Sequence, residues 1–570
     1  MSRLLTYARR ILPFLSWFPL SRASLRADLI AGASVAVVLI PQAMAYAQLA
    51  GVPPHLGLYA ALVPTIVGAL FGSCAQLNTG PVAMSSLLSY AVLTDLNIAP
   101  CPSPEFTTLA VILAGLTGMI LLAVGVFKLT VVVNFISHPA ITGFTNAGAI
   151  IIALTQLGKL LGVTQPRTGF YLHDVATTLA YLHHCHFPTF LFGISSLLGL
   201  LLIKRIKPQW PGVLIIVIVA ILASWLTGYG TRWNGAIIGD IPRGFPPLSA
   251  PHASWELLVR LLPGAAVVAL IGFMETAAVC KTIATHTRQR LNLRQEVIAQ
   301  GLAKIAGFFF SCFTTSGSLS RSALNWYSGA RTGFSSIVAA ATVALTLLFL
   351  TPLLHHLPNA VLAAIIIVAV SQLINFRAMR RIWQADRLDG ITAWLTFAAC
   401  LLLAPKIAEG ILAGVVLALG VHLYRIMRPH VALLAPHPDG TYRDGDRHAL
   451  PFFDDIIILR FEGRLCFANA EHFELSLLDA LNRFPRARAV VIAADGINTI
   501  DASGEEKLRD IFFHLRDSGI TLAFAETKWR VLDVIERTGL HHLIGPKNFF
   551  RTIDQALASL RPHHPAPSSS

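Results

Sequence analysis

The chain has 570 residues, of which 54% are hydrophobic and only 13% are Asp, Glu, Lys or Arg. Soluble domains are about a quarter charged, so this composition predicts a membrane protein with many spans and excludes an ordinary soluble enzyme. The formal net charge is +14, but no basic patch is interleaved with aromatic side chains. Nucleic-acid binding is therefore not expected, and the excess charge is assigned to the loops that set membrane orientation.

Apolar runs that are able to span or half-span a membrane begin near about fourteen positions. They are Leu29, Leu58, Val82, Thr108, Asn134, Thr189, Val213, Leu261, Val297, Ser322, Ser335, Pro358, Ile391 and Ile411. Several runs are shorter than the ~20 residues that a full crossing needs. Short runs of this kind predict broken or re-entrant helices that are buried within protein.

The placement of Lys and Arg predicts the orientation. With the N-terminus inside, the inner loops receive most of these residues, among them the groups at 204–207, 281–294 and 377–387. The outer loops receive Arg167, Arg232, Arg243, Lys406 and little else. By the positive-inside rule both ends are cytoplasmic, and we expect a multi-pass protein of a bacterial-type inner membrane.

The composition changes near residue 436, where charge becomes frequent and apolar runs shorten to strand length. The predicted strands are Ile456–Phe461, Ala489–Ala493 and Thr521–Ala525, and helical patterns at 471–482, 504–515 and 529–538 alternate with them. This alternation predicts a small α/β domain. We therefore expect a lead-in at 1–27, a transmembrane domain at 28–429, the α/β domain at 436–561 and a disordered tail at 562–570.

Two polar stretches interrupt the apolar runs, and their sequences are TTSGSLSRSALN at residues 314–325 and QLNTGPVAMSS at 76–86. Arg321, in the first, lies at bilayer depth, where a charge costs at least ~2.5–3.5 kcal/mol and usually marks an ion or substrate pathway. The alternative is an arginine that snorkels from a helix end. Each stretch also has the signals of a helix start, where free N–H groups favour an anion. Such paired interruptions indicate a transporter site, and we predict an anion between two facing helix starts.

Glu275 is a lone carboxylate within the apolar run 265–280. A carboxylate that takes up a proton when it is exposed to one side of the membrane, and releases it when it is exposed to the other, would couple transport to protons. The alternative is a structural glutamate that bonds to a neighbouring helix, and Arg321 is a possible ion-pair partner. The residues alone leave these roles open.

Metal and catalytic motifs are weak in this sequence. Its seven cysteines contain no Cys-x-x-Cys pair, and the loop YLHHCH at 181–186 has no second cluster to complete a metal site. No His-Glu-x-x-His motif and no Gly-x-Ser-x-Gly elbow occurs among the spans. We expect no metal, no cofactor and no enzymatic activity.

Several segments together resemble the sulfate permease (SulP) family of anion transporters. They are RADLIAG at 26–32, IPQAMAYA at 40–47, GVPPHLGLYAA at 51–61, NTGPVA at 78–83 and SLSRSALN at 318–325. The soluble end, with DASG at 501–504 opening a helix, resembles the STAS domain that follows the membrane part in this family. The resemblance covers nearly the whole chain in the right order.

The resemblance implies a polytopic helical fold of two inverted seven-span repeats, divided into core and gate domains, plus the cytoplasmic STAS domain. Residues that match the family's anion site are Gln42 and Tyr46 in the first span, Gly80, Pro81, Val82 and Ala83 in the third, and Ser320 and Arg321 in the tenth. Glu275 matches an acidic position tied to cation coupling. Ala502 stands where regulated relatives have a phosphoacceptor serine, and Ser503 keeps a hydroxyl one place further on.

The expected function is secondary active transport of an inorganic anion, namely sulfate taken up with a proton, with sodium as the other candidate coupling ion. The alternatives are bicarbonate or C4-dicarboxylate transport, nucleobase permeases of similar architecture, and a passive anion channel. The expected partners are the anion, the coupling ion, the lipid bilayer and a second copy of the chain in a homodimer.

Overall fold

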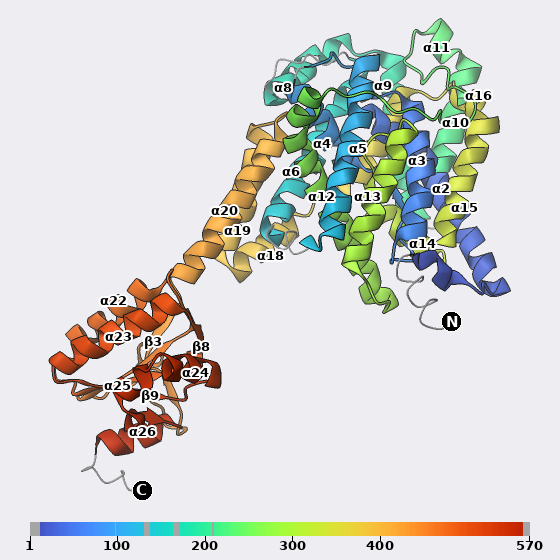
Figure 1. Cartoon of the computed structure of the whole chain (residues 1–570). Helices are drawn as coiled ribbons and strands as arrows, with labels where there is room; N and C mark the ends of the chain where they lie inside the picture. The colour runs from blue at the N-terminus through green and yellow to red at the C-terminus, as the bar shows by residue number, and fades with distance from the viewer. Residues whose placement is uncertain (1–11, 97, 130–136, 164–170, 208–209, 562–570) are drawn as a thin grey trace. The chain divides into compact units, whose positions relative to one another are not determined.

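The computed structural model describes residues 12–96, 98–129, 137–163, 171–207 and 210–561 (Figure 1). The chain divides into two compact units, Met1–Ala418 and Leu419–Ser570. The first unit is a bundle of helices and the second is an α/β domain. The predicted tail at 562–570 and residues 1–11 of the predicted lead-in lie outside the described residues.

The helical unit repeats one order of elements. The first half contains α2 (Arg22–Leu49), α3 (Pro54–Phe71), β1 (Thr79–Gly80), α4 (Ala83–Asp95), α5 (Pro104–Val126), α6 (His138–Thr155), α9 (Phe187–Ile206) and α10 (Gly212–Thr227). The second half contains α12 (Trp255–Thr287), α13 (Leu293–Phe309), β2 (Ser316–Gly317), α14 (Leu319–Tyr327), α15 (Phe334–Leu345), α17 (Asn359–Ser371), α19 (Arg387–Leu402) and α20 (Ile407–Met427). In each half a long helix, a second helix and a two-residue strand precede a short helix and four more helices.

Short elements connect or extend these helices. In the first half they are η1 (Pro13–Trp17), α7 (Leu157–Leu161), α8 (Tyr171–Ala180), η3 (Tyr181–His184) and α11 (Tyr229–Arg232). In the second half they are η4 (Thr346–Leu350), α16 (Thr351–Leu354) and α18 (Phe376–Ala385).

The predicted apolar runs correspond to these helices. Each predicted start except Asn134 falls inside a helix or at its N-cap, and Asn134 lies outside the described residues. Among the described residues, nine helices are long and apolar enough to cross a membrane. The helices α4 and α14 are much shorter, with 13 and 9 residues, as expected for elements that end inside protein. The total number of crossings stays a prediction.

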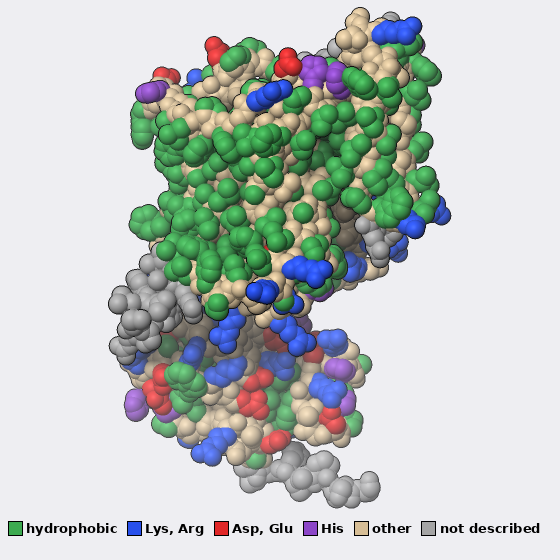
Figure 2. Space-filling view, turned by 90° about the vertical axis from the view of Figure 1, so that its right-hand side faces the viewer, with side chains coloured by type: hydrophobic (Ala, Val, Ile, Leu, Met, Phe, Trp, Pro, Cys, Tyr) green, Lys and Arg blue, Asp and Glu red, His purple; other side chains and the backbone are tan. Residues whose placement is uncertain are grey.

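The surface of the helical unit is consistent with a lipid environment. Figure 2 shows hydrophobic side chains that cover most of one face of this unit, with Lys and Arg side chains gathered at its lower edge. An apolar surface of this extent is unfavourable in water. The unit is thus a multi-pass membrane domain.

The second unit contains a sheet of six strands in the order β10-β9-β7-β5-β3-β4. Its strands are β3 (Val431–Pro436), β4 (Tyr442–Asp444), β5 (Ile456–Phe461), β7 (Ala489–Ala493), β9 (Thr521–Ala525) and β10 (Phe549–Phe550). β5, β7, β9 and β10 are parallel, whereas β3 runs antiparallel to β5 and β4 antiparallel to β3. A separate pair is formed by β6 (Gly463–Leu465) and β8 (Ile497–Ile500). The three predicted strands have the predicted bounds, and β3 begins before residue 436.

Helices cover both faces of this sheet. α22 (Ala470–Arg483), α23 (Ala502–Asp517) and α24 (Trp529–Arg537) lie at the three predicted helical patterns and pack with Ile457 and Leu459 on one face. α26 (Ile553–Leu560) packs with Ile456 and Ile458 on the other. This alternation follows from the period of two in a strand. The remaining elements are α21 (Gly445–His448), η5 (Ala494–Gly496), α25 (Leu540–Ile544) and η6 (Pro546–Asn548).

Candidate functional site

The strands β1 and β2 bring the two polar stretches together. They pair antiparallel, with Thr79 opposite Gly317 and Gly80 opposite Ser316. α4 begins three residues after Gly80 and α14 begins two residues after Gly317. The antiparallel pair therefore places the starts of two short helices beside each other, and each start presents N–H groups that have no partner within its helix.

Neighbouring helices hold both strands in place. Thr65 Oγ1 on α3 donates to the Thr79 carbonyl at 2.6 Å, and Gln300 Nε2 on α13 donates to Thr79 Oγ1 at 2.8 Å. On the other strand, Ser316 Oγ donates to the Gly272 carbonyl at 2.7 Å, and Gly317 N donates to Thr276 Oγ1 at 3.0 Å. All of these side chains are buried, so the strand pair is a fixed platform.

Arg321 lies on the first turn of α14 and is fully buried. Its Nε donates to Asn78 Oδ1 at 2.8 Å and its Nη1 to the Pro81 carbonyl at 2.9 Å. Its Nη2 is buried and has no hydrogen-bond partner among the described residues. Both acceptors are neutral, so these bonds orient the guanidinium without balancing its charge. A buried cation in this arrangement requires an anion nearby.

Gly80 gives the guanidinium its space. A Cβ built on Gly80 would lie 3.1 Å from Arg321 Nη2. A methyl group there would occupy the side of the guanidinium that has no hydrogen-bond partner. The backbone of β1 can approach the cation because residue 80 is glycine.

We expect Gly80→Ala to weaken anion binding about tenfold. The new methyl group would either displace Arg321 by a few tenths of an ångström or occupy the space of the ligand. Isothermal calorimetry with sulfate on the purified protein measures this change. Gly420→Ala on α20 is the matched control, since a Cβ there meets nothing within 4 Å. Equal affinities for the two variants would contradict the assigned role of Gly80.

The start of α4 is polar and has no side-chain cap. Val82 is the N-cap residue and makes no side-chain hydrogen bond. Pro81, Val82 and Ala83 are buried, as is Ser85, whose Oγ has no partner among the described residues. Gly272 on α12 faces this start, since a Cβ built on it would lie 3.6 Å from Ser85 Oγ. Ser85 is thus an additional hydroxyl at the site, which the sequence analysis did not single out.

Gln42 and Tyr46 lie one turn apart on the same side of α2, and both are buried. Tyr46 interacts electrostatically with Arg321 and with Glu275. Gln42 Oε1 is buried without a partner in the described part of the chain. Tyr46 therefore lies close enough to the predicted cation to interact with it.

Ser320 is exposed, and its Oγ lies 3.4 Å from Ser318 Oγ. Ser318, rather than Ser320, caps α14, because its Oγ accepts from Arg321 N at 3.4 Å. The serine cluster therefore divides into a capping hydroxyl and an accessible one.

Glu275 lies in the middle of α12, beside Thr276, which holds β2. Its side chain is partly buried, and its Oε2 is a buried atom with no hydrogen-bond partner among the described residues. It interacts electrostatically with Arg321. Glu275 and Arg321 are therefore close enough to interact electrostatically, and an ion-pair role for Glu275 stays a prediction.

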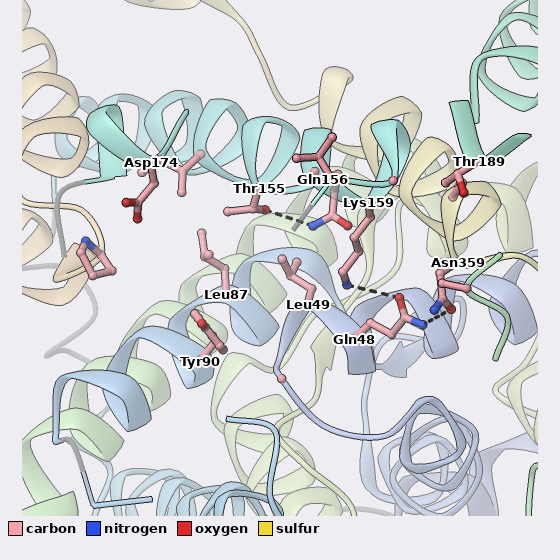
Figure 3. Close-up of a pocket in the computed structure, with 18 of the residues that line it drawn as sticks. Gln48, Leu49, Leu87, Tyr90, Thr155, Gln156, Lys159, Asp174, Thr189 and Asn359 are labelled. Carbon is pink, nitrogen blue, oxygen red and sulfur yellow. Dashed lines mark hydrogen bonds between the residues drawn. The ribbon is translucent and has the colours of Figure 1, made fainter. Parts of the chain in front are cut away.

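The helical unit also contains a cavity of about 740 Å³ (Figure 3). It is lined by the C-terminal end of α2, by α4 from Leu87 onward, and by residues of α6, α7 and α17. Gln48 crosses one side of it, where Nε2 donates to Asn359 Oδ1 at 2.8 Å and Oε1 accepts from Lys159 Nζ at 3.3 Å. These bonds join α2 to α7 and α17. The lining includes none of the predicted anion-site residues.

No group of three His, Cys, Asp or Glu residues suited to a metal ion occurs in the described ranges. In the 181–186 loop, His183 and His184 belong to η3, whereas Cys185 and His186 follow it. The side chains of Leu182 and His184 are not among those that the structure describes.

Asp501 in the second unit serves as a helix cap. Its Oδ1 accepts from Gly504 N at 2.9 Å at the start of α23, and its Oδ2 accepts from Phe467 N at 3.1 Å. Ala502 and Ser503 follow it and are exposed. Ser503 is thus accessible on the first turn of α23, and a regulatory role for it stays a prediction.

Short helices that begin inside a membrane domain, with a buried cation at their starts, are features of membrane transporters. The model of the sulfate permease family matches residues 25–396, and that of the STAS domain matches residues 448–556. The chain belongs to the sulfate permease family and carries a C-terminal STAS domain.

Curated relatives agree with this assignment. The chain is 34% identical to "Probable sulfate transporter 4.2" of Arabidopsis thaliana over 93% of its own length and 80% of that protein. It is 31% identical to "Probable sulfate transporter Rv1739c" of Mycobacterium tuberculosis, over 95% of its own length and 96% of that protein.

Solved structures share the fold. The murine Slc26a9 anion transporter in the inward-facing state matches with a TM-score of 0.89 at 23% identity, covering 98% of this chain and 95% of that one. The transmembrane domain of the cyanobacterial bicarbonate transporter BicA matches with a TM-score of 0.60 at 22% identity, covering 70% of this chain and 99% of that one.

Proposed function

We propose that this protein takes up sulfate by proton symport, with the anion bound between the starts of α4 and α14. The observation that supports this most strongly is the buried Nη2 of Arg321, which has no partner in the described chain and lies beside Gly80. Relatives of similar length are sulfate transporters by name. A fixed cation with nearby N–H groups and hydroxyls suits an oxyanion, because each oxygen accepts several hydrogen bonds.

In this proposal Arg321, Ser85 and the first N–H groups of α4 hold the anion. Tyr46, Gln42 and Ser320 line the same space. Glu275 carries the coupling proton, because it lies close enough to Arg321 to sense whether an anion is bound. Proton loss from Glu275 restores the ion pair with Arg321 after the anion leaves.

The cavity in Figure 3 is assigned to the outer route of the anion. With both termini cytoplasmic, the C-terminal end of α2 faces outwards, and so does this cavity. The bonds from Gln48 to Lys159 and Asn359 then join the helices that must separate when the outer route opens. The site itself stays on α2, α4, α12 and α14, of which the last three are joined through the β1–β2 platform.

The proposal places the protein in a bacterial-type inner membrane. The STAS domain is assigned to assembly of a homodimer, and the exposed aromatic side chains of Phe467 and Trp529 are available for such a contact. A crosslink between copies through cysteines placed at these two positions tests the dimer.

Uptake of radiolabelled sulfate by proteoliposomes tests the function. An acidic outside and an alkaline inside should drive sulfate above its equilibrium level, and a protonophore should abolish this accumulation. A sodium gradient in place of the pH gradient should not drive it. Dissipation of an existing sulfate gradient without accumulation would instead indicate a channel, and competition by bicarbonate or a C4-dicarboxylate would reassign the substrate.

A further inference from the structure

Lys304 is a second buried cation near the anion site, and the function above does not use it. It lies on α13, its side chain is 2% exposed, and it is among the largest fully buried side chains in the described chain. Its Nζ has no hydrogen-bond partner among the described residues. An ammonium group with three donors is rarely buried in this way unless a charge balances it.

Lys304 lies one helical turn from a residue of α13 that contacts the β1–β2 platform. Gln300 precedes it by four residues, so both lie on one face of the helix, and Gln300 Nε2 donates to Thr79 Oγ1 on β1 at 2.8 Å. On α5, a Cβ built at Gly118 would lie 2.9 Å from the Cβ of Lys304. Gly118 therefore permits the close approach of α5 that covers the stem of the lysine.

The charged group that interacts with Lys304 is the carboxylate of Glu275. Glu275 on α12 interacts electrostatically with both Lys304 and Arg321. Arg321 on α14 and Tyr46 on α2 interact with Glu275 in turn. One carboxylate is therefore shared by two buried cations.

Other titratable groups on the packed helices are remote or already bound. Glu296 precedes Lys304 by two turns of α13, and its Oε1 accepts from Ser73 Oγ at 2.8 Å and from Cys74 N at 2.6 Å. α5 carries Glu105 on its first turn, thirteen residues before Gly118. α3 carries His55 and Tyr59 near its start. Glu275 remains the carboxylate that faces Lys304.

We propose that Lys304 is the second fixed cation of the anion site and makes it select a dianion that is carried with a proton. This inference rests on the proposed function and deepens it. Arg321, Lys304 and an ionised Glu275 leave one positive charge in excess. A bound sulfate dianion makes the sum one negative charge, and a proton on Glu275 returns it to zero. Neutral sums are favoured because a net buried charge is costly.

Without Lys304 the balance changes. Arg321 and a protonated Glu275 then match a monoanion, whereas sulfate leaves one negative charge in excess. Perchlorate is a suitable probe, because it is a tetrahedral oxyanion of similar size to sulfate with a single charge. Because the two anions have similar shapes, the ratio of their dissociation constants reports the number of positive charges in the site and is independent of the shape of the site.

The test uses the purified full-length protein and calorimetry with both anions. Lys304→Met keeps the length of the side chain and removes its charge. We expect the sulfate dissociation constant to rise at least about tenfold, since a charge-assisted contact is lost, while that of perchlorate does not rise. Lys304→Arg keeps the charge and should retain the wild-type ratio. Lys281→Met, at an exposed position of α12, is the matched control and should change neither constant.

A purely structural role for Lys304 would give a different result, because a damaged fold weakens the binding of sulfate and of perchlorate equally. Lys304→Gln serves as the neutral variant if the methionine variant is not monodisperse. The same change of ratio is expected in a Glu275→Gln background, because Lys304 acts on the anion itself. A wild type that binds sulfate, together with neutral variants of unchanged ratio, would overturn this inference alone. A wild type without affinity for sulfate would overturn the proposed function as well.

Discussion

Arg321→Glu is expected to abolish sulfate uptake while the protein still inserts and purifies as a single species. The guanidinium is fully buried and is held by Asn78 and by the Pro81 carbonyl. A carboxylate in its place would face these two acceptors and repel the anion. Arg321→Ala should lower sulfate affinity about tenfold to a hundredfold, because a charge-assisted contact contributes about 1.5–3 kcal/mol.

The measurement is uptake and calorimetric affinity on the purified variants. Arg331→Ala is the matched control, since Arg331 is exposed and bonds to Asp28 through its backbone N–H, which the substitution keeps. This control should transport like the wild type. Wild-type uptake by monodisperse Arg321→Glu protein would show that Arg321 does not bind the anion.

Glu275→Gln is expected to keep sulfate binding and to lose its dependence on pH. The amide has nearly the shape of a protonated carboxyl group, but it cannot take up or release a proton. Sulfate uptake should then no longer be driven by a pH gradient, although exchange of sulfate across the membrane should continue. Affinity and uptake measured over a range of pH report the two effects separately.

Glu256→Gln is the control for this variant, because Glu256 is an exposed carboxylate on the first turn of the same helix. It should keep the full pH dependence. Concentrative uptake by Glu275→Gln under a pH gradient would place the coupling proton on another group.

The helices were predictable because their signals are local. Apolar runs of membrane length predict helices wherever the chain is in lipid, and the strands of the STAS domain have alternating faces. The short α4 and α14 were also predictable, because Pro81 and Ser318 mark their starts. Arg321 and Glu275 stood out as charges in apolar runs, a signal that needs no knowledge of the fold.

The partners of these residues were not predictable, because they are distant in sequence. Asn78 and Arg321 are separated by 243 positions, and no local pattern selects one as the acceptor of the other. Ser85 resembles any helical serine until the structure shows that its hydroxyl has no partner in the described residues. Lys304 is different, since a lysine in an apolar run carries the same signal as Glu275 and was open to prediction.

Anomalous scattering from crystals of the full-length protein soaked in selenate locates the bound anion. Selenate has the shape and charge of sulfate, and its selenium is located without reference to the protein. We expect one peak between the starts of α4 and α14, within contact of Arg321 Nη2 and next to Gly80. A peak in the cavity beside Lys159, with none at Arg321, would contradict this expectation.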